Sequence, residues 1–144
     1  PPPPKTLFPY TTLFRSGCTA VTLVCATGGR IDHELANLSL LEEAYALGVQ
    51  MEIIDRQNRI VLHAGGCMKF KMPTGYKYFS LVPLDAVLHG VTIENAKYPL
   101  HDATVTRAGM ITISNEAAAN ETVAVEIRDG RAIVVFSRDL APAL

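Results

Sequence analysis

The spacing of hydrophobic residues differs between the amino-terminal and the carboxyl-terminal part of the chain. Residues 19–26, TAVTLVCA, form an apolar and largely β-branched run that ends at two glycines, which is typical of a fully buried parallel strand. Leu35, Leu38 and Leu41 then recur at helical spacing, and Gly48 stands where a helix should stop. This order predicts a strand, a glycine turn and an amphipathic helix.

Short strands follow the helix, because the helical period gives way to alternation. They are expected at residues 50–55, 59–63, 67–72, 77–82, 87–94, 104–107, 110–114, 122–128 and 131–137. Asp129 and Gly130 predict a two-residue hairpin turn between the last two strands. Turn residues at 73–75 indicate a domain boundary. We therefore expect an α/β unit over residues 17–74, an antiparallel β-sandwich over residues 75–139 and a short tail, residues 140–144.

The first sixteen residues differ from the rest of the chain. Four prolines and a lysine precede TLFPYTTLFRS, which resembles the in-frame translation of a sequencing adapter. The segment lacks the basic start, apolar centre and cleavage site of a signal peptide. We expect residues 1–16 to be a non-native leader that takes no part in the core; an ordinary flexible leader is the alternative.

Composition narrows the classes of partner. The net charge is -1 and the sequence pI is near 6.5, so no overall charge draws the chain to nucleic acid or to an anionic membrane. No apolar run reaches transmembrane length. Cys18, Cys25 and Cys67 form no CxxC pair, which favours reduced, mostly buried thiols in a cytoplasmic protein. His63 lacks neighbours at ligand spacing and is expected to be a partly exposed surface residue.

The turn between the first strand and the helix carries the clearest candidate chemistry. Gly28 and Gly29 let the main chain approach a ligand closely, and Arg30 offers a planar cation that matches phosphate oxygens. Helix amino-termini at strand ends also favour anions. Asp32 is placed to cap the helix. The alternative is a tight turn with a solvated Arg30 and a capping Asp32.

Several ordered blocks resemble one enzyme family. GGRIDHELANLSLL, residues 28–41, is similar to the GGRxDHxLANxxLL segment of thiamine pyrophosphokinases. IIDRQNRIVL, residues 53–62, resembles the hairpin that follows that family's helix, and YFSLVPL, GVTIENAKYPL and ISNE resemble its carboxyl-terminal domain. The resemblance implies the strand, helix and hairpin of a Rossmann-like catalytic domain, followed by a thiamine-binding β-sandwich.

The resemblance also implies an activity. The family transfers a pyrophosphoryl group from ATP to thiamine with Mg2+, giving thiamine diphosphate and AMP, and it works in the cytoplasm as a homodimer with the site at the interface. Gly28, Gly29, Arg30 and Asp32 would then bind ATP and its pyrophosphate. Arg30 and Asp32 would be catalytic, and Asp32 would also be a metal ligand.

The thiamine-binding pair implied by the resemblance is Ser114 and Asn115. Both are expected at the end of the strand predicted at residues 110–114, where they would place a hydroxyl and an amide together. Taken without the resemblance, the same residues are typical of a turn that ends a strand.

The family's amino-terminal metal-binding aspartates have no counterpart in the sequence. The six aspartates of the chain are scattered and form no Asp-x-Asp pair. Because phosphoryl chemistry needs carboxylates to hold its metal, we expect a truncated enzyme that is inactive alone. Two alternatives stay open: a non-catalytic ligand-binding or dimerisation module, and a generic Rossmann-like nucleotide binder.

Overall fold

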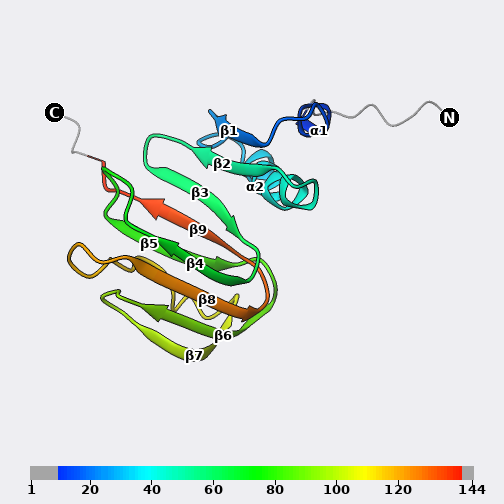
Figure 1. Cartoon of the computed structure of the whole chain (residues 1–144). Helices are drawn as coiled ribbons and strands as arrows, with labels where there is room; N and C mark the ends of the chain where they lie inside the picture. Colours follow the sequence, from blue (N-terminus) through cyan, green and yellow to red (C-terminus); the bar gives the residue numbers. More distant parts are fainter. Residues whose placement is uncertain (1–9, 141–144) are drawn as a thin grey trace.

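The computed structural model describes residues 10–140, which contain two helices and nine strands (Figure 1). The helices are α1 (Tyr10–Phe14) and α2 (Ile31–Ala46), and neither is long and apolar enough to cross a membrane. The strands are β1 (Ala20–Val24), β2 (Gln50–Ile54), β3 (Asn58–His63), β4 (Gly66–Phe70), β5 (Tyr78–Pro83), β6 (Val87–Glu94), β7 (Leu100–Thr106), β8 (Val123–Asp129) and β9 (Ala132–Ser137). Of the predicted strands, the one at residues 110–114 is absent.

The first sheet has the strand order β1-β2-β3-β9-β5. β1 and β2 run parallel and are joined through α2, whereas the other neighbouring pairs are antiparallel. β1 is therefore a parallel strand, as predicted. The expected full burial of β1 is wrong, because it is an edge strand of this sheet and Val24 is 60% exposed.

The second sheet, β4-β8-β6-β7, is antiparallel and packs against the first. The core between the sheets is apolar, with Phe79 and Phe136 of the first sheet against Val125 of the second. Phe70 of β4 contacts Phe79 and Phe136 edge-on, at centroid distances of 5.3 and 4.9 Å. The predicted β-sandwich is therefore present.

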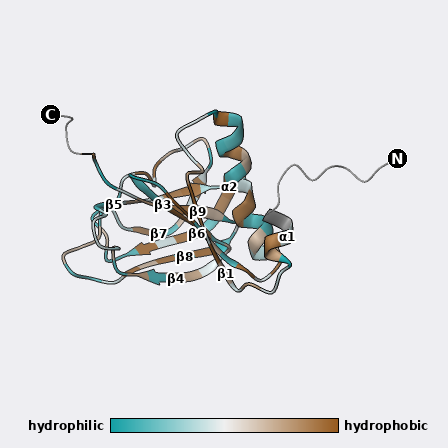
Figure 2. Cartoon of the chain, turned by 90° about the horizontal axis from the view of Figure 1, so that it is seen from above, coloured by the Kyte–Doolittle hydropathy of each residue, from teal (hydrophilic) through white to brown (hydrophobic). Residues whose placement is uncertain are grey.

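α2 covers the other face of the first sheet. Leu41 and Ala44 are buried there in a second core that includes Ile53 of β2. Figure 2 shows apolar positions along the strands and an alternation of apolar and polar positions on α2. Leu35, by contrast, is 57% exposed, so the apolar stripe of the helix that reaches the sheet is narrower than its leucine spacing predicts.

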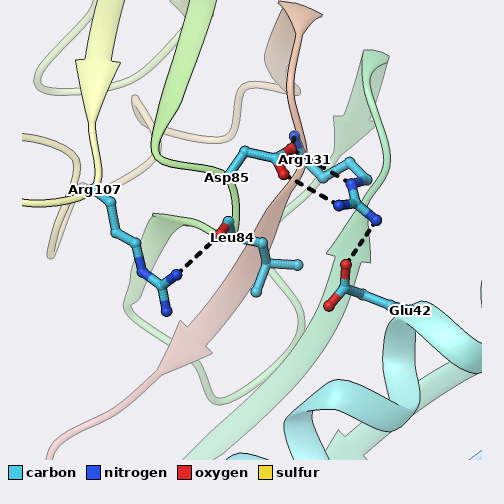
Figure 3. Close-up of polar contacts among 5 residues, drawn as sticks. All are labelled: Glu42, Leu84, Asp85, Arg107 and Arg131. Carbon is cyan, nitrogen blue, oxygen red and sulfur yellow. Dashed lines mark hydrogen bonds and ion pairs between the residues drawn. The ribbon is translucent and has the colours of Figure 1, made fainter.

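A charged network attaches α2 to the connections between β5 and β6 and between β8 and β9 (Figure 3). Arg131 donates to Glu42 of α2 at 2.7 Å and to the Asp85 carboxylate at 3.1 Å. Arg107 donates to the carbonyl of Leu84 in the same region. The Arg131 guanidinium lowers the pKa of Asp85, so the pair is fully charged at neutral pH.

The hairpin predicted at Asp129 and Gly130 is wrong. β8 and β9 lie in different sheets, β8 between β4 and β6 and β9 between β3 and β5. Gly130 has a φ of +108°, and a Cβ there would approach Leu88 Cδ2 to 2.7 Å. An Asp-Gly pair is compatible with a hairpin turn and also with a tight connection between two sheets. Here β8 and β9 are each buried in a different sheet, so the pair forms the connection.

The expectation that the leader takes no part in the core is wrong for α1. Phe14 is 4% exposed and belongs to the core beneath α2, together with Leu41. Cys18 also donates to the carbonyl of Leu13, at 3.2 Å. Residues 1–9 and 141–144 lie outside the described residues, and so do the expectations that concern them.

Two further expectations about burial are wrong. Cys25 and Cys67 are exposed, because β1 and β4 are edge strands and each cysteine lies in or next to one of them. His63, which the sequence predicts to be a partly exposed surface residue, is 1% exposed. It ends β3 with its ring turned to the second sheet, where Nε2 is 2.9 Å from the carbonyl oxygen of Val125.

The two sheets do not divide the chain at residue 75. β3 and β4, which precede that residue, pair with β9 and β8, which follow it. Each sheet therefore combines strands from both sides of the predicted boundary. The division into residues 17–74 and 75–139 stays a prediction.

Candidate functional site

A groove of about 660 Å³ opens where β1 and β2 end. Because these strands are parallel, the turns that follow them lie at the same edge of the sheet, where open α/β sheets bind ligands. The groove is lined by Thr27, Gly28, Glu34, Leu38, Asp55, Arg56, Gln57, Asn58, Ile60, Ile133, Val135 and Leu140. Its polar side is thus built from the two turns and the start of α2.

The glycine turn, residues 27–30, leads from β1 into α2. Gly28 has a φ of +83°, a conformation that residues with side chains rarely adopt. The backbone N–H of Gly29 donates to Glu34 Oε1 at 2.9 Å, and Asn37 Nδ2 donates to the carbonyl of Ala26 at 2.8 Å. Two side chains of α2 therefore fix the shape of the turn.

Asp55, directly after β2, joins the two turns of the groove. Its Oδ1 accepts the backbone N–H groups of Gln57 and Asn58, each at 2.7 Å, and its Oδ2 accepts the Thr27 hydroxyl at 2.6 Å. Partial burial pushes the pKa of Asp55 upward, but the hydrogen bonds, that from Thr27 first, outweigh it and lower the pKa below its usual value. Asp55 is an ionised carboxylate that holds the groove together.

Arg30 and Asp32 follow Gly29 and pair with each other. Arg30 Nη2 lies 2.5 Å from Asp32 Oδ2, and the two side chains are 73% and 58% exposed. The hydrogen bond from Arg30 lowers the pKa of Asp32. A phosphate would therefore compete with Asp32 for the guanidinium. Asp32 is not the N-cap residue, because α2 begins at Ile31 with Arg30 at the N-cap position and no side-chain cap hydrogen bond. Its Oδ1 does accept the backbone N–H of His33 in the first turn, at 3.0 Å.

Ser114 and Asn115 do not end a strand. Ser114 is exposed and has a φ of +57°, which interrupts the alternation that predicted the strand. Its backbone N–H donates to Ser80 Oγ at 2.9 Å. Asn115 is 3% exposed and forms an isolated bridge with Phe79 of β5. The segment thus runs irregularly along the free side of β5.

The structure separates the two predicted groups of site residues. The glycine turn and Asp32 follow β1, at one edge of the first sheet, whereas Ser114 and Asn115 lie beside β5, at the opposite edge. β2, β3 and β9 lie between these edges. A single chain therefore does not bring the two groups together.

The residues predicted to hold Mg2+ do not form a metal site within residues 10–140. No three histidine, cysteine, aspartate or glutamate side chains gather as ligands in that range. The Asp32 carboxylate is paired with Arg30, and both Asp55 oxygens accept hydrogen bonds. Mg2+ requires several oxygen ligands in octahedral geometry, so these residues by themselves do not fit it.

Sequence reasoning missed three residues that shape these two regions: Thr27, Asn37 and Tyr98. Asn37 could have been found from the sequence, because it belongs to the block at residues 28–41 that resembles the family segment. Thr27 bonds to Asp55 across 28 positions, and Tyr98 bonds to Asn115 across 17. No local pattern shows contacts over such separations.

Comparisons with known proteins agree with the fold. Residues 67–131 match the family profile described as thiamin pyrophosphokinase, vitamin B1 binding domain. A curated thiamine pyrophosphokinase from Bacillus subtilis (strain 168) is 33% identical over 90 residues, which cover 62% of this chain and 42% of that protein. The matched segment therefore spans less than half the length of this relative.

Solved structures extend the similarity to almost the whole chain. A thiamine pyrophosphokinase from Bacillus subtilis has a TM-score of 0.85 at 27% identity, covering 91% of this chain and 61% of its own. One from Geobacillus thermodenitrificans has a TM-score of 0.81 at 28% identity, covering 93% and 61%. The fold that this chain shares with these structures is a β-sandwich with an adjoining strand-helix unit. The predicted resemblance to thiamine pyrophosphokinases is confirmed.

Proposed function

We propose that this chain supplies the thiamine-binding sandwich and one edge of the nucleotide site of a thiamine pyrophosphokinase. The match of residues 67–131 to a vitamin B1 binding domain carries the proposal. In the full reaction a pyrophosphoryl group passes from ATP to the hydroxyethyl oxygen of thiamine, which gives thiamine diphosphate and AMP. Mg2+ would neutralise phosphate charge in that reaction. A cytoplasmic location suits an enzyme that uses ATP.

We assign ATP to the groove beside the glycine turn. Gly28 would offer its backbone N–H to a phosphate oxygen, and Arg30 would neutralise charge on the transferred group. The N–H of Gly29, which donates to Glu34 Oε1, would serve a phosphate only after leaving that carboxylate. Asp32, which is paired with Arg30, would orient that guanidinium. The support is the position of the groove at the carboxyl ends of two parallel strands.

We assign thiamine to the region of Ser114 and Asn115, and we propose that two chains complete the site. The two groups of residues lie at opposite edges of one sheet, so the nucleotide of one chain would meet the thiamine of another. Met110, Ile111 and Ile113, next to Ser114, are 65%, 59% and 38% exposed. An exposed apolar run of this kind suits an interface between two copies.

A non-catalytic ligand-binding or dimerisation module is the second candidate, with thiamine as the ligand to test. It is favoured by the lack of a grouped set of metal ligands within residues 10–140. The enzyme part and a thiamine-binding module both predict that the chain alone binds thiamine without converting it, whereas a pure dimerisation module predicts no binding. They differ in the role of Arg30, which is catalytic in the enzyme and has no catalytic role in the module.

Calorimetry of the purified chain tests thiamine binding. We expect Ser114→Ala to weaken binding about fivefold, since one hydrogen bond is worth about 1 kcal/mol. Ser39→Ala, an exposed serine on α2, is the matched control and should bind like the unmodified chain. The absence of thiamine binding by the unmodified chain would reject the assignment.

Turnover separates the enzyme from the module. The chain with ATP, Mg2+ and thiamine should give no thiamine diphosphate by chromatography. A hybrid that adds the part of the Bacillus subtilis relative that lies outside the match should give product, and Arg30→Ala should slow it at least tenfold, about 1.4 kcal/mol of transition-state stabilisation. A hybrid that binds thiamine but gives no product favours the module. An active hybrid whose rate does not change with Arg30→Ala shows that Arg30 is not part of the site.

A further inference from the structure

The first turn of α2 supplies carboxylates to the hydrogen-bond donors of the glycine turn. The backbone N–H of Gly29 donates to Glu34 Oε1 at 2.9 Å. The Arg30 guanidinium pairs with Asp32, whose Oδ1 also accepts the backbone N–H of His33 at 3.0 Å. Carboxylates of the chain itself therefore occupy donors that are also suited to phosphate oxygens.

Glu34 is the carboxylate among these that has no assigned role. It falls on the second variable position of the GGRxDHxLAN segment, so the resemblance gives it no part in binding or catalysis. It lines the same groove as Gly28. Among residues 10–140 it belongs to no ion pair, so no neighbouring cation neutralises its charge. Asp55, the other carboxylate of the groove, gives its oxygens to the Thr27 hydroxyl and to the turn between β2 and β3.

A phosphate can exchange with Glu34 because both groups of the contact reach water. Gly29 is exposed and Glu34 is half-buried, so the carboxylate is free to turn towards solvent as a ligand arrives. The exchange replaces one charge-assisted hydrogen bond of the Gly29 N–H with another and therefore gains little. The displaced carboxylate stays on the first turns of α2, where its negative charge repels the phosphate.

We propose that Glu34 is an internal competitor for phosphate at the Gly29 N–H and that it limits how tightly the glycine turn binds an anion. This rests on the proposed nucleotide site and adds to it a residue that weakens binding. The cost of displacing Glu34 falls on every phosphate ligand. A nucleotide that also contacts the rest of the groove offsets this cost, whereas pyrophosphate alone does not.

Calorimetric titration of the purified chain with inorganic pyrophosphate, in the absence of metal, tests the proposal. Glu34→Gln removes the charge but keeps an acceptor, and it should bind pyrophosphate about fivefold more tightly than the unmodified chain at low salt. Glu34→Ala, which frees the Gly29 N–H, should also bind more tightly. In about 0.5 M NaCl the gain of Glu34→Gln should fall to about twofold or less, because salt screens a charge effect.

Glu43→Gln is the matched control, since it makes the same change of charge near the other end of α2. It should bind pyrophosphate like the unmodified chain. A gain as large as that of Glu34→Gln would show a general effect of net charge and reject the proposal. If Glu34→Ala does not fold, Glu34→Gln and Glu43→Gln decide the question by themselves.

A purely structural role of Glu34 predicts a change of the opposite sign. If Glu34 shapes the turn for phosphate, Glu34→Ala binds pyrophosphate more weakly, which rejects the proposal. Equal affinity of Glu34→Gln and the unmodified chain also rejects it and leaves the nucleotide site in place. If neither chain binds pyrophosphate, the nucleotide assignment fails and this inference fails with it. Thiamine titration of the same samples tests the other edge of the sheet separately.

Discussion

His63 shows how burial sets the charge of one residue. Gly65 donates its backbone N–H to Nδ1 at 3.3 Å, so Nε2 carries the proton and donates to Val125 in the other sheet at 2.9 Å. Burial lowers the pKa of His63, although the Val125 carbonyl acts in the opposite direction. Protonation of Nδ1 would place two donors against each other. The ring therefore links the sheets only in its neutral form.

We expect His63 to make the chain less stable at mildly acidic pH. Because its folded pKa lies below the ordinary 6.5, the unfolded chain takes up the proton first as pH falls. Neutral His63 therefore makes its full contribution to the free energy of unfolding above about pH 6.5. Below that pH the contribution is lost, by at most about 1.4 kcal/mol at pH 5.5. Urea unfolding at pH 7.5 and 5.5 measures this, and His63→Gln should flatten the difference. His89→Gln, at an exposed position, should not; equal pH dependence in both variants would contradict the role of His63.

At the scale of elements, α1 is anchored by one side chain. Phe14→Ala should lower the free energy of unfolding by about 3 kcal/mol, because it removes a buried ring from the core beneath α2. Leu13→Ala is the control, since Leu13 is 43% exposed, and it should change stability by no more than about 0.5 kcal/mol. Denaturant unfolding measures both. If the two variants are equally stable, α1 does not contribute to the core in solution.

At the scale of the whole molecule, the separation of the two site regions predicts a dimer. Ile111→Glu should shift the chain towards monomer in sedimentation equilibrium, because a charge replaces a 59% exposed apolar side chain beside Ser114. Leu35→Glu is the matched control, since Leu35 is 57% exposed on α2, and it should leave the assembly unchanged. A monomer at all concentrations would reject the shared site. A dimer disrupted only by Leu35→Glu would place the interface on α2.

The sequence by itself determined the local elements and the resemblance. The period of 3.6 predicted α2, and alternation predicted β6 at the residues where it lies, 87–94. Turn residues and helix spacing act within a few positions of the chain, so a single sequence displays them. The ordered motifs predicted the relationship to thiamine pyrophosphokinases before any geometry was known.

Only the tertiary structure decided which elements meet. It placed β8 and β9 in different sheets despite the Asp129-Gly130 signal, and it left β1 at an edge despite its apolar composition. It also buried His63 and turned the amide of Asn115 onto the Tyr98 backbone. Burial and hydrogen bonding depend on partners brought from distant positions, such as Val125 for His63, 62 residues away. A local sequence pattern carries no information about such distant partners, so only the tertiary structure identifies them.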